Sequence, residues 1–378
     1  MKKILTTIFI LLLIAIAVAW LHQRQQLMPI VFSPTESNVP VQSSNQENNE
    51  PEVIIDNLSV PWGMAFINEN EMLITERTGT VLLYNLENNS ERAIYQKPSL
   101  QGGEGGLLGI TLHPDFNRNT YVYLYDTYEL NGNRLNKIDR YTYDDEELSF
   151  DRTIINNIPG AKYHDGGRMA FGPDDKLYVT TGDATVPNLA QELNSLAGKI
   201  LRMNDDGSIP SDNPFTNSFI YSYGHRNPQG LAWDSDGNLW STEHGPSGLN
   251  AGQDELNQIL AGGNYGWPMY SGTERPSPNS DTENENLMYP VVASGPDEVW
   301  APAGLAYYDD ILYFGGLRGE SLYQYDIDEE EFTRQFVGDY GRLRTTLIND
   351  GVLYMSTSNT DGRGRPDDSD DKIIQLSL

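Results

Sequence analysis

The chain has 378 residues, no cysteine and a net charge of −29 at pH 7. The lack of cysteine excludes disulfides, thiol catalysis, zinc–cysteine sites and iron–sulfur clusters, and the negative charge argues strongly against nucleic-acid binding. The same charge fits either plain solubility or affinity for a hard cation such as calcium, which prefers oxygen ligands.

Residues 1–26 differ from the rest of the chain. Lys2 and Lys3 precede an apolar run from Ile4 to Trp20, and a basic start followed by an apolar core is typical of an export signal peptide. Ala17-Val18-Ala19 offers a cleavage site. The run of about 17 residues is also just long enough to span a bilayer as an uncleaved anchor. Either interpretation places the remainder outside the cytoplasm: periplasmic, secreted, or membrane-anchored and facing outward.

Residues 27–50 are predicted to be a flexible polar linker. The stretch 33–51 is rich in Ser, Asn, Gln, Pro and Glu, a composition that buries too little apolar surface to order itself. The globular domain is therefore expected to occupy residues 51–378.

A phrase recurs six times in this domain: a small or apolar pair, a short turn with Asp, Asn or Gly, and then a strand. The copies cover residues 61–76, 107–126, 166–183, 228–245, 302–319 and 344–362. Their starts are separated by roughly 40 to 75 residues, a spacing that suits one four-stranded blade per copy.

The repeats predict an all-β fold, a six-bladed β-propeller of four-stranded antiparallel blades. A β-sandwich or another all-β repeat array is the alternative. In a propeller the inner strands surround a channel and the loops at one end form a site, so distant repeats can contribute to one pocket. The Asn-, Glu- and Pro-rich stretch from Ser271 to Glu298 breaks the rhythm and is expected to be a surface excursion.

Among the five histidines, His164 is the strongest catalytic candidate. It lies in Tyr163-His164-Asp165-Gly166-Gly167-Arg168, immediately before a strand. Loops at strand ends often carry chemistry, the glycine pair permits close approach of a ligand, and imidazole is well matched to proton abstraction near neutral pH. A buried structural histidine is the alternative.

The other histidines within the domain have simpler interpretations. His113 is expected to be a turn residue, and His225 and His244 to shape loops. Arg226-Asn227-Pro228 follows His225 and combines a planar fork of donors, an amide and a fixed backbone. This group is either a functional element or a loop salt bridge.

Three arginines form a cationic group: Arg318, Arg342 and Arg344. On a strand, Arg342 and Arg344 face the same side. Two cations on one face of an acidic protein repel each other unless an anion or carboxylates lie between them. A buried anionic ligand would explain the pair, and surface charge is the alternative.

Oxygen ligands suited to calcium gather in a fourth group. It comprises Glu243-His244-Gly245-Pro246, Asp254-Glu255-Leu256-Asn257 and Gly263-Asn264-Tyr265-Gly266-Trp267-Pro268. The spacing is not that of an EF-hand, so chemistry alone points only weakly to calcium.

Several segments, in order over roughly residues 54 to 378, resemble the soluble glucose dehydrogenase and aldose sugar dehydrogenase family. They are Gly105-Gly106-Leu107-Leu108-Gly109, Leu112-His113-Pro114-Asp115-Phe116, Gly167-Arg168, Gly198-Lys199-Ile200-Leu201-Arg202, Tyr223-Gly224-His225-Arg226-Asn227-Pro228-Gln229-Gly230 and Asn264-Tyr265-Gly266-Trp267-Pro268. The last two together are specific. Members are six-bladed propellers that use pyrroloquinoline quinone (PQQ) and calcium.

The resemblance implies a role for each candidate. His164 would take the proton from the anomeric hydroxyl of the sugar while hydride passes to C5 of the quinone, and Arg226 and Asn227 would lie beside the reacting quinone oxygens. Arg342 and Arg344 would hold quinone carboxylates, and Arg318 falls where members often carry a basic residue.

The resemblance also implies metal and substrate sites. The carbonyls of Gly245 and Pro246 would hold the calcium ion that polarises the cofactor, and Glu255 and Tyr265 would belong to a second, structural calcium site. Glu104 stands where some members use Gln to hold sugar, and Tyr163 precedes the histidine where the glucose enzymes carry Asp. Both differences favour the broader aldose-type branch.

The sequence thus predicts a quinoprotein that oxidises aldoses at C1 to lactones and passes electrons to an external acceptor, as a monomer or homodimer. A non-enzymatic sugar- or protein-binding propeller is one alternative, because a fold alone implies no function. A calcium-dependent lactonase-type hydrolase using His164 on water is another.

Overall fold

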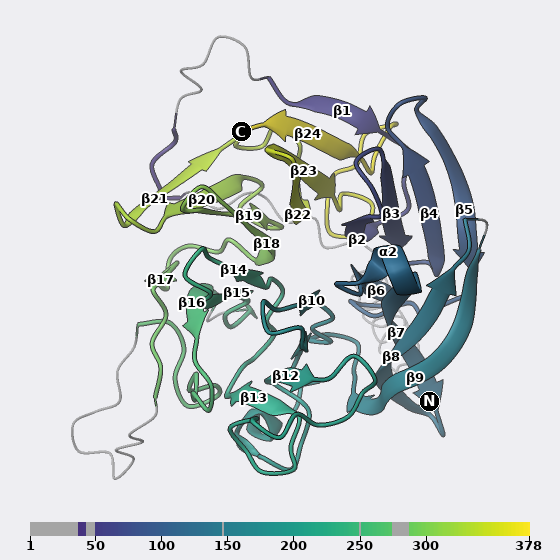
Figure 1. Ribbon diagram of the computed structural model, residues 1–378. Helices are drawn as coiled ribbons and strands as arrows, with labels where there is room; N and C mark the ends of the chain where they lie inside the picture. The colour runs from purple at the N-terminus through teal and green to yellow at the C-terminus, as the bar shows by residue number, and fades with distance from the viewer. Residues whose placement is uncertain (1–36, 43–49, 146, 249–250, 274–286) are drawn as a thin grey trace, which may run out of the picture.

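The computed structural model describes residues 37–42, 50–145, 147–248, 251–273 and 287–378. Their regular secondary structure is almost entirely β-strand, apart from a four-residue helix, α2 (Phe116–Asn119), and a 3-10 helix, η1 (Pro187–Gln191). The strands form six four-stranded antiparallel sheets arranged as blades around a central axis (Figure 1). The predicted six-bladed propeller is confirmed.

The blades are numbered here in chain order, each from its innermost strand. Blade 1 comprises β2 (Pro61–Phe66), β3 (Glu71–Glu76), β4 (Thr80–Asn85) and β5 (Ser90–Gln96). Blade 2 comprises β6 (Leu107–Leu112), β7 (Tyr121–Leu130), β8 (Asn133–Tyr143) and β9 (Leu148–Pro159). Blade 3 comprises β10 (Met169–Phe171), β11 (Leu177–Thr181), β12 (Lys199–Met203) and β13 (Ile220–Tyr223).

The second half of the ring follows the same pattern. Blade 4 comprises β14 (Ala232–Trp233), β15 (Leu239–Glu243), β16 (Glu255–Ile259) and β17 (Val292–Ala293). Blade 5 comprises β18 (Pro302–Tyr308), β19 (Ile311–Gly316), β20 (Leu322–Asp326) and β21 (Glu331–Gln335). Blade 6 comprises β22 (Leu343–Asn349), β23 (Val352–Thr357), β24 (Ile373–Ser377) and β1 (Glu52–Ile55).

The six repeated phrases of the sequence correspond to the two inner strands of the six blades. The copy at 61–76, for example, contains β2 and β3, and the copy at 344–362 contains β22 and β23. Inner strands of neighbouring blades contact each other around the axis. The repeated sequence therefore covers the strands that pack against the adjacent blades, where all six blades have similar surroundings.

Ring closure joins the two ends of the globular domain. Strand β1 pairs antiparallel with β24 as the outermost strand of blade 6, with Glu52 opposite Gln375. Because β1 leads directly into blade 1, this pairing ties the last blade to the first. The repeat phrases do not include β1, so the repeats do not predict this pairing.

Packing between blades explains which strands are most apolar. All five residues of β11, β12 and β15 are buried, because blades stack on both faces of these strands. Between blades 2 and 3, Tyr123 and Tyr125 pack against Val179 and Leu201. The continuous burial of these middle strands departs from the simple alternation of a half-exposed sheet.

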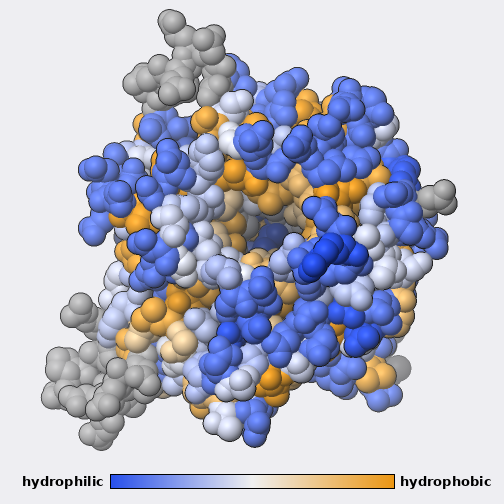
Figure 2. Space-filling model, in the orientation of Figure 1, coloured by the Kyte–Doolittle hydropathy of each residue, from blue (hydrophilic) through white to orange (hydrophobic). Residues whose placement is uncertain are grey.

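Strand direction gathers the functional loops at one end of the ring. In each antiparallel blade, the entry to the first strand and the exit from the second lie at the same end. Loops before β6, β10, β14 and β22 and loops after β11, β15, β19 and β23 therefore share one rim. In the face-on view the ring is hollowed at its centre, with hydrophilic residues in the hollow (Figure 2).

The long excursion predicted between Ser271 and Glu298 contains one strand of the fold. Its residues 287–298 include β17, the short outer strand of blade 4, which pairs with β16. Residues 274–286 of the excursion lie outside the described residues.

Residues 37–42 form a strap along the outer edge of blade 5. Val41 makes a parallel bridge with Arg334 of β21, and Arg334 donates through Nε to the carbonyl of Val39 (3.2 Å). Buried Glu298 accepts hydrogen bonds from the Ser37 hydroxyl, from Asn38 N (3.1 Å) and from Trp300 Nε1 (2.6 Å). The strap lies within the range predicted as linker and covers what would otherwise be an open sheet edge.

Glu298→Gln is expected to lower the free energy of unfolding by about 1–3 kcal/mol, since one amide hydrogen must face a buried donor. Urea unfolding measures the change. Glu329→Gln, on the exposed turn between β20 and β21, is the control and should stay within about 0.5 kcal/mol. Equal stability of the two variants would contradict a structural role for the strap contact.

No helix among the described residues is long and apolar enough to cross a membrane. The predicted signal peptide or anchor, residues 1–26, lies outside the described residues, so export and anchorage stay predictions.

Candidate active site

His164 lies at the functional rim, in the loop between β9 and β10. Its φ angle of +64° is left-handed, a conformation that costs energy for a residue with a side chain. Nδ1 is 2.7 Å from Oδ1 of Asp183, which is fully buried after β11. Oδ2 of Asp183 accepts a hydrogen bond from Trp267 Nε1 (2.8 Å). With Nδ1 held by the carboxylate, Nε2 is the ring nitrogen left to exchange a proton.

Glu104, in the loop between β5 and β6, joins the loops of Asn227 and Arg363 to the His164 loop. Its Oε2 accepts the backbone N–H of His164 (2.8 Å) and Nδ2 of Asn227 (3.3 Å). Its Oε1 accepts Nη1 of Arg363 (3.1 Å), from the loop between β23 and β24. Although burial opposes ionisation, Arg363 together with His244 and His164 lowers the pKa of Glu104 to about 2. Glu104 is therefore an anion at any working pH.

Arg226 and Asn227 are held by buried Glu243 at the end of β15. Oε1 of Glu243 accepts the backbone N–H groups of Arg226 and Asn227. The Arg226 guanidinium lies 5.4 Å from the Trp267 ring and donates to the carbonyl of His244 (3.4 Å). Burial lowers its pKa from the ordinary arginine value. The two residues thus reach the His164 region, as predicted, and Arg226 does so without a carboxylate ion-pair partner among the described residues.

Asp361 lies between two of the predicted arginines. Its Oδ2 is 2.8 Å from Nη2 of Arg342 and 3.5 Å from Nη2 of Arg344, and its side chain is 1% exposed. Both arginines therefore reach the same side, as alternation predicts. One carboxylate balances one of the two cations, so positive charge remains in excess.

Arg168 adds a cation that the sequence analysis did not single out. Its guanidinium lies 4.3 Å from the Trp62 ring, while that of Arg344 lies 6.0 Å from the same ring. It donates to the carbonyl of Gln229 (3.0 Å) and to Thr345 Oγ1 (3.1 Å). Desolvation, with a smaller contribution from Arg344, lowers its pKa to about 9. Among the described residues no carboxylate pairs with it.

Arg318 is placed beside this group by its backbone. It follows β19, and its N–H donates to the carbonyl of Trp300 (3.0 Å). The adjoining Leu317 carbonyl accepts Nη1 of Arg342 (2.6 Å). The rim therefore brings together arginines from three different blades.

The predicted calcium residues lie in and around blade 4. Gly245 N donates to Asp254 Oδ1 (2.8 Å), and a Cβ at Gly245 would lie 2.1 Å from the Gly252 carbonyl oxygen, so glycine is required there. Among the described residues the protein donates no hydrogen bond to the carbonyl oxygens of Gly245 and Pro246.

Glu255 lies opposite Glu243 where β16 pairs with β15. Burial, reinforced by the charge of Glu243, raises the pKa of Glu255 to about 8. Both residues, with Gly245 and Tyr265, line a cavity of about 10 Å³, near the smallest size that holds one water molecule. Tyr265 Oη instead donates to the Gln258 carbonyl (2.7 Å). Within the described residues, no cluster of three His, Asp or Glu could hold a metal ion.

Of the other histidines, His225 is held by structural contacts, whereas His244 is buried with no hydrogen-bond partner for its Nε2 among the described residues. His225 Nε2 is 2.8 Å from Ser222 Oγ and its Nδ1 is 2.8 Å from Glu243 Oε2. This resembles a hydrolytic triad, but Ser222 and His225 are both 0% exposed, so no substrate reaches them. Burial lowers the pKa of His244 to about 3, which keeps it neutral.

His113 behaves as a turn residue, since its Nδ1 accepts the backbone N–H of Asp115 (2.9 Å). Tyr163 projects at the rim, 37% exposed, with Arg363 and Lys162 each 5.3 Å from its ring.

Several residues of the site have no role predicted from the sequence: Asp183, Asp361, Arg363 and Trp62, and also Trp267 and Arg168, which occur only within longer motifs. Asp183 was marked by its position directly after the strand of the third repeat, and Arg168 by the Gly167-Arg168 motif. Asp361 and Arg363 lie in an Asp- and Gly-rich loop that reads as an ordinary turn.

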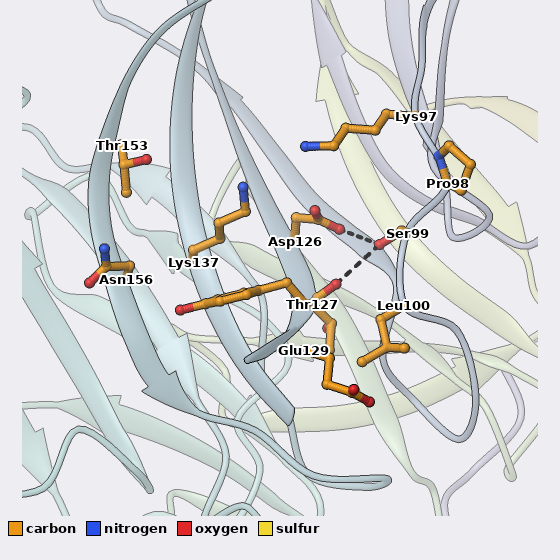
Figure 3. A pocket seen from close by; sticks show the side chains of 11 residues that line it. Lys97, Pro98, Ser99, Leu100, Asp126, Thr127, Glu129, Lys137, Thr153 and Asn156 are labelled. Carbon is orange, nitrogen blue, oxygen red and sulfur yellow. Dashed lines mark hydrogen bonds between the residues drawn. The ribbon is translucent and has the colours of Figure 1, made fainter. Parts of the chain in front are cut away.

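A groove of about 520 Å³ lies elsewhere, on blade 2, between β7, β8, β9 and the loop at residues 97–100 (Figure 3). Lys97, Asp126 and Lys137 are among its lining residues. It shares none of them with the His164 cluster, so its size does not make it the active site.

Comparison with known proteins agrees with this geometry. Residues 58–366 match the family described as Glucose / Sorbosone dehydrogenase. Quinoprotein glucose dehydrogenase B of Acinetobacter calcoaceticus is 39% identical over 264 residues, which cover 61% of this chain and 54% of that protein. Aldose sugar dehydrogenase YliI of Escherichia coli is 31% identical over 348 residues, covering 82% of this chain and 90% of that protein.

Solved structures are similar over nearly the whole propeller. The PQQ-bound form of aldose sugar dehydrogenase from Streptomyces coelicolor is 37% identical, with a TM-score of 0.79, and the match covers 88% of this chain and 99% of that one. The soluble aldose sugar dehydrogenase of Escherichia coli in its apo-form is 28% identical, with a TM-score of 0.75, covering 87% and 99%. The chain therefore belongs to the Glucose / Sorbosone dehydrogenase family.

Proposed function

We propose that this protein is a PQQ-dependent dehydrogenase that oxidises aldoses at C1 to aldonolactones, with His164 as general base. One observation carries the proposal. The imidazole of His164, held by the Asp183 carboxylate, lies at the same rim as more buried arginines than there are carboxylates, within the described residues, to pair with them. The first suits proton abstraction from a hydroxyl, and the second suits a polyanionic cofactor.

The residues present fit PQQ, which carries three carboxylates. Arg342 and Arg344 share the single carboxylate of Asp361, and Arg168 has none among the described residues. Buried cations without partners are costly, and bound carboxylates would relieve that cost. Trp62, stacked under Arg168, supplies an aromatic surface beside them.

The chain's own groups would act as follows. Asp183 holds Nδ1 of His164, so that Nε2 accepts the proton of the anomeric hydroxyl, and the carboxylate stabilises the imidazolium that forms. Bound PQQ would supply the two-electron oxidant for the hydride that leaves C1. Arg226 and Asn227 would lie beside its reacting oxygens, where the guanidinium stabilises developing negative charge.

Calcium would bind at two places. The carbonyl oxygens of Gly245 and Pro246 would hold the ion that polarises the cofactor. A second ion beside Glu255 would relieve the repulsion between two buried carboxylates, although Tyr265 contributes no hydroxyl to it, because that group is bonded to the Gln258 carbonyl.

The remaining parts of the proposal follow the family and the sequence. Glu104 and Tyr163 border the place where sugar would bind, and electrons would pass on to an external acceptor. The protein would act outside the cytoplasm, as a monomer or homodimer, released or held by its N-terminal segment. Against a hydrolase or a plain binding propeller stands the arginine group, which calls for a polyanionic ligand.

Reconstitution tests the proposal. The purified chain is loaded with PQQ and calcium, and reduction of an artificial dye is followed with a panel of aldoses. Sugar-dependent dye reduction that requires PQQ supports the proposal. Failure to bind PQQ, or sugar binding without turnover, would leave the non-enzymatic propeller as the better interpretation.

Glu255→Gln is expected to remove most of the calcium-induced stabilisation of the PQQ-free protein. A single site filled at 100 times its Kd stabilises the wild type by about 2.7 kcal/mol. Unfolding is measured with calcium and with a chelator. Glu331→Gln, at the exposed first residue of β21, should keep the full calcium effect, whereas equal effects in both variants would place the ion elsewhere.

A further inference from the structure

Glu104 hydrogen-bonds the backbone of the His164 loop on both sides of Tyr163. Glu104 N donates to the carbonyl of Lys162 (2.8 Å), and Glu104 Oε2 accepts the N–H of His164 (2.8 Å). Because His164 holds a left-handed φ of +64°, its loop needs such contacts to keep the imidazole in place.

Arg363 fixes the orientation of this carboxylate. Its Nη1 bonds Oε1 of Glu104 at 3.1 Å, while Oε2 is shared by His164 and Asn227. Both oxygens of Glu104 therefore already have partners. The residue is better placed to hold the loop than to offer a free acceptor to a sugar hydroxyl.

We propose that Glu104 and Arg363 form a positioning pair for His164: Arg363 orients the carboxylate, and the carboxylate fixes the backbone that carries the imidazole. The inference rests on the proposed function, in which His164 is the base. It assigns Arg363, in the last blade, to the working site of blade 3.

Replacing both partners tests the pair. In Glu104→Gln the amide oxygen can still accept from His164, but the amide nitrogen then faces Arg363, donor against donor. We expect kcat to fall about tenfold, as for loss of one charge-assisted hydrogen bond, with KM within about twofold. Adding Arg363→Gln supplies an acceptor for that nitrogen, so the double variant should recover to within about threefold of wild-type kcat.

Arg363→Gln alone should lower kcat about threefold, which keeps the test informative if Glu104→Gln folds poorly. Arg365→Gln, exposed in the same loop, is the control for a lost cation. A raised KM with unchanged kcat in Glu104→Gln would make Glu104 a direct sugar ligand. Losses that multiply in the double variant would also overturn the pairing.

Amide hydrogen exchange in the PQQ-free protein separates this inference from the proposed function. Exchange of the peptide containing residues 160–168 should quicken in Glu104→Gln and slow again in the double variant. If this exchange pattern is found but the wild type has no dehydrogenase activity, the positioning pair is retained and the proposed function is rejected. If the wild type is active but exchange in Glu104→Gln is unchanged, the positioning pair is rejected.

Discussion

His164→Asn is expected to lower kcat/KM for an aldose about 1000-fold, within the range attributed to a general base. Asparagine is chosen because it tolerates the left-handed backbone of position 164 better than most residues, so the loop keeps its course. Its amide has no basic nitrogen at the place of Nε2. Dye-reduction kinetics measure the effect.

Two measurements show whether the loss lies in chemistry. PQQ affinity, measured without sugar, and the unfolding midpoint should both match the wild type, since neither depends on the base. The control is His113→Asn. His113 lies in the turn after β6, at the end of the ring opposite the His164 rim, so this variant should keep full activity. Turnover of His164→Asn within threefold of the wild type would remove His164 from the mechanism.

Arg344→Gln is expected to weaken PQQ binding about 10- to 100-fold, the effect of losing one charged hydrogen bond to a carboxylate. Arg344 is preferred to Arg342, because Arg342 also supports the fold through the Leu317 and Ser358 carbonyls. Removing the Arg344 guanidinium leaves Asp361 paired with Arg342. Equilibrium dialysis of PQQ without sugar gives the affinity directly.

Arg152→Gln is the matched control, because Arg152 is a half-exposed arginine on β9, away from the rim. It should bind PQQ as the wild type does. Unchanged PQQ affinity in Arg344→Gln would mean that the buried arginines bind another anion. The assignment of PQQ as their ligand would then be rejected.

The blades could be predicted because their information is local. Each repeat carries its own turn and its own pair of strands, and these became β2–β3, β6–β7 and their counterparts. The outer strands were less visible. β17 has two residues inside an irregular stretch, and β1 belongs to blade 6 through pairing with β24, at the opposite end of the chain.

The sequence pointed to the candidate base and to the cationic candidates of the proposed site but not to their partners. His164, Arg226, Arg342 and Arg344 were found from residue type, glycine neighbours and alternation. The carboxylates that hold them, such as Asp183 and Asp361, look like any other acidic residue in a chain with 54 Asp and Glu.

The sequence by itself determined the number of blades and the class of fold, because strand period and turn chemistry act between near neighbours. Tertiary structure alone decided that Arg363 reaches Glu104 and that Asp361 leaves positive charge uncompensated. The contact between Arg363 and Glu104 joins residues 259 positions apart and exists only once the ring has closed. Asp361 meets Arg342 and Arg344 within blade 6, 19 and 17 positions away, but only the folded blade brings its loop back over both guanidinium groups.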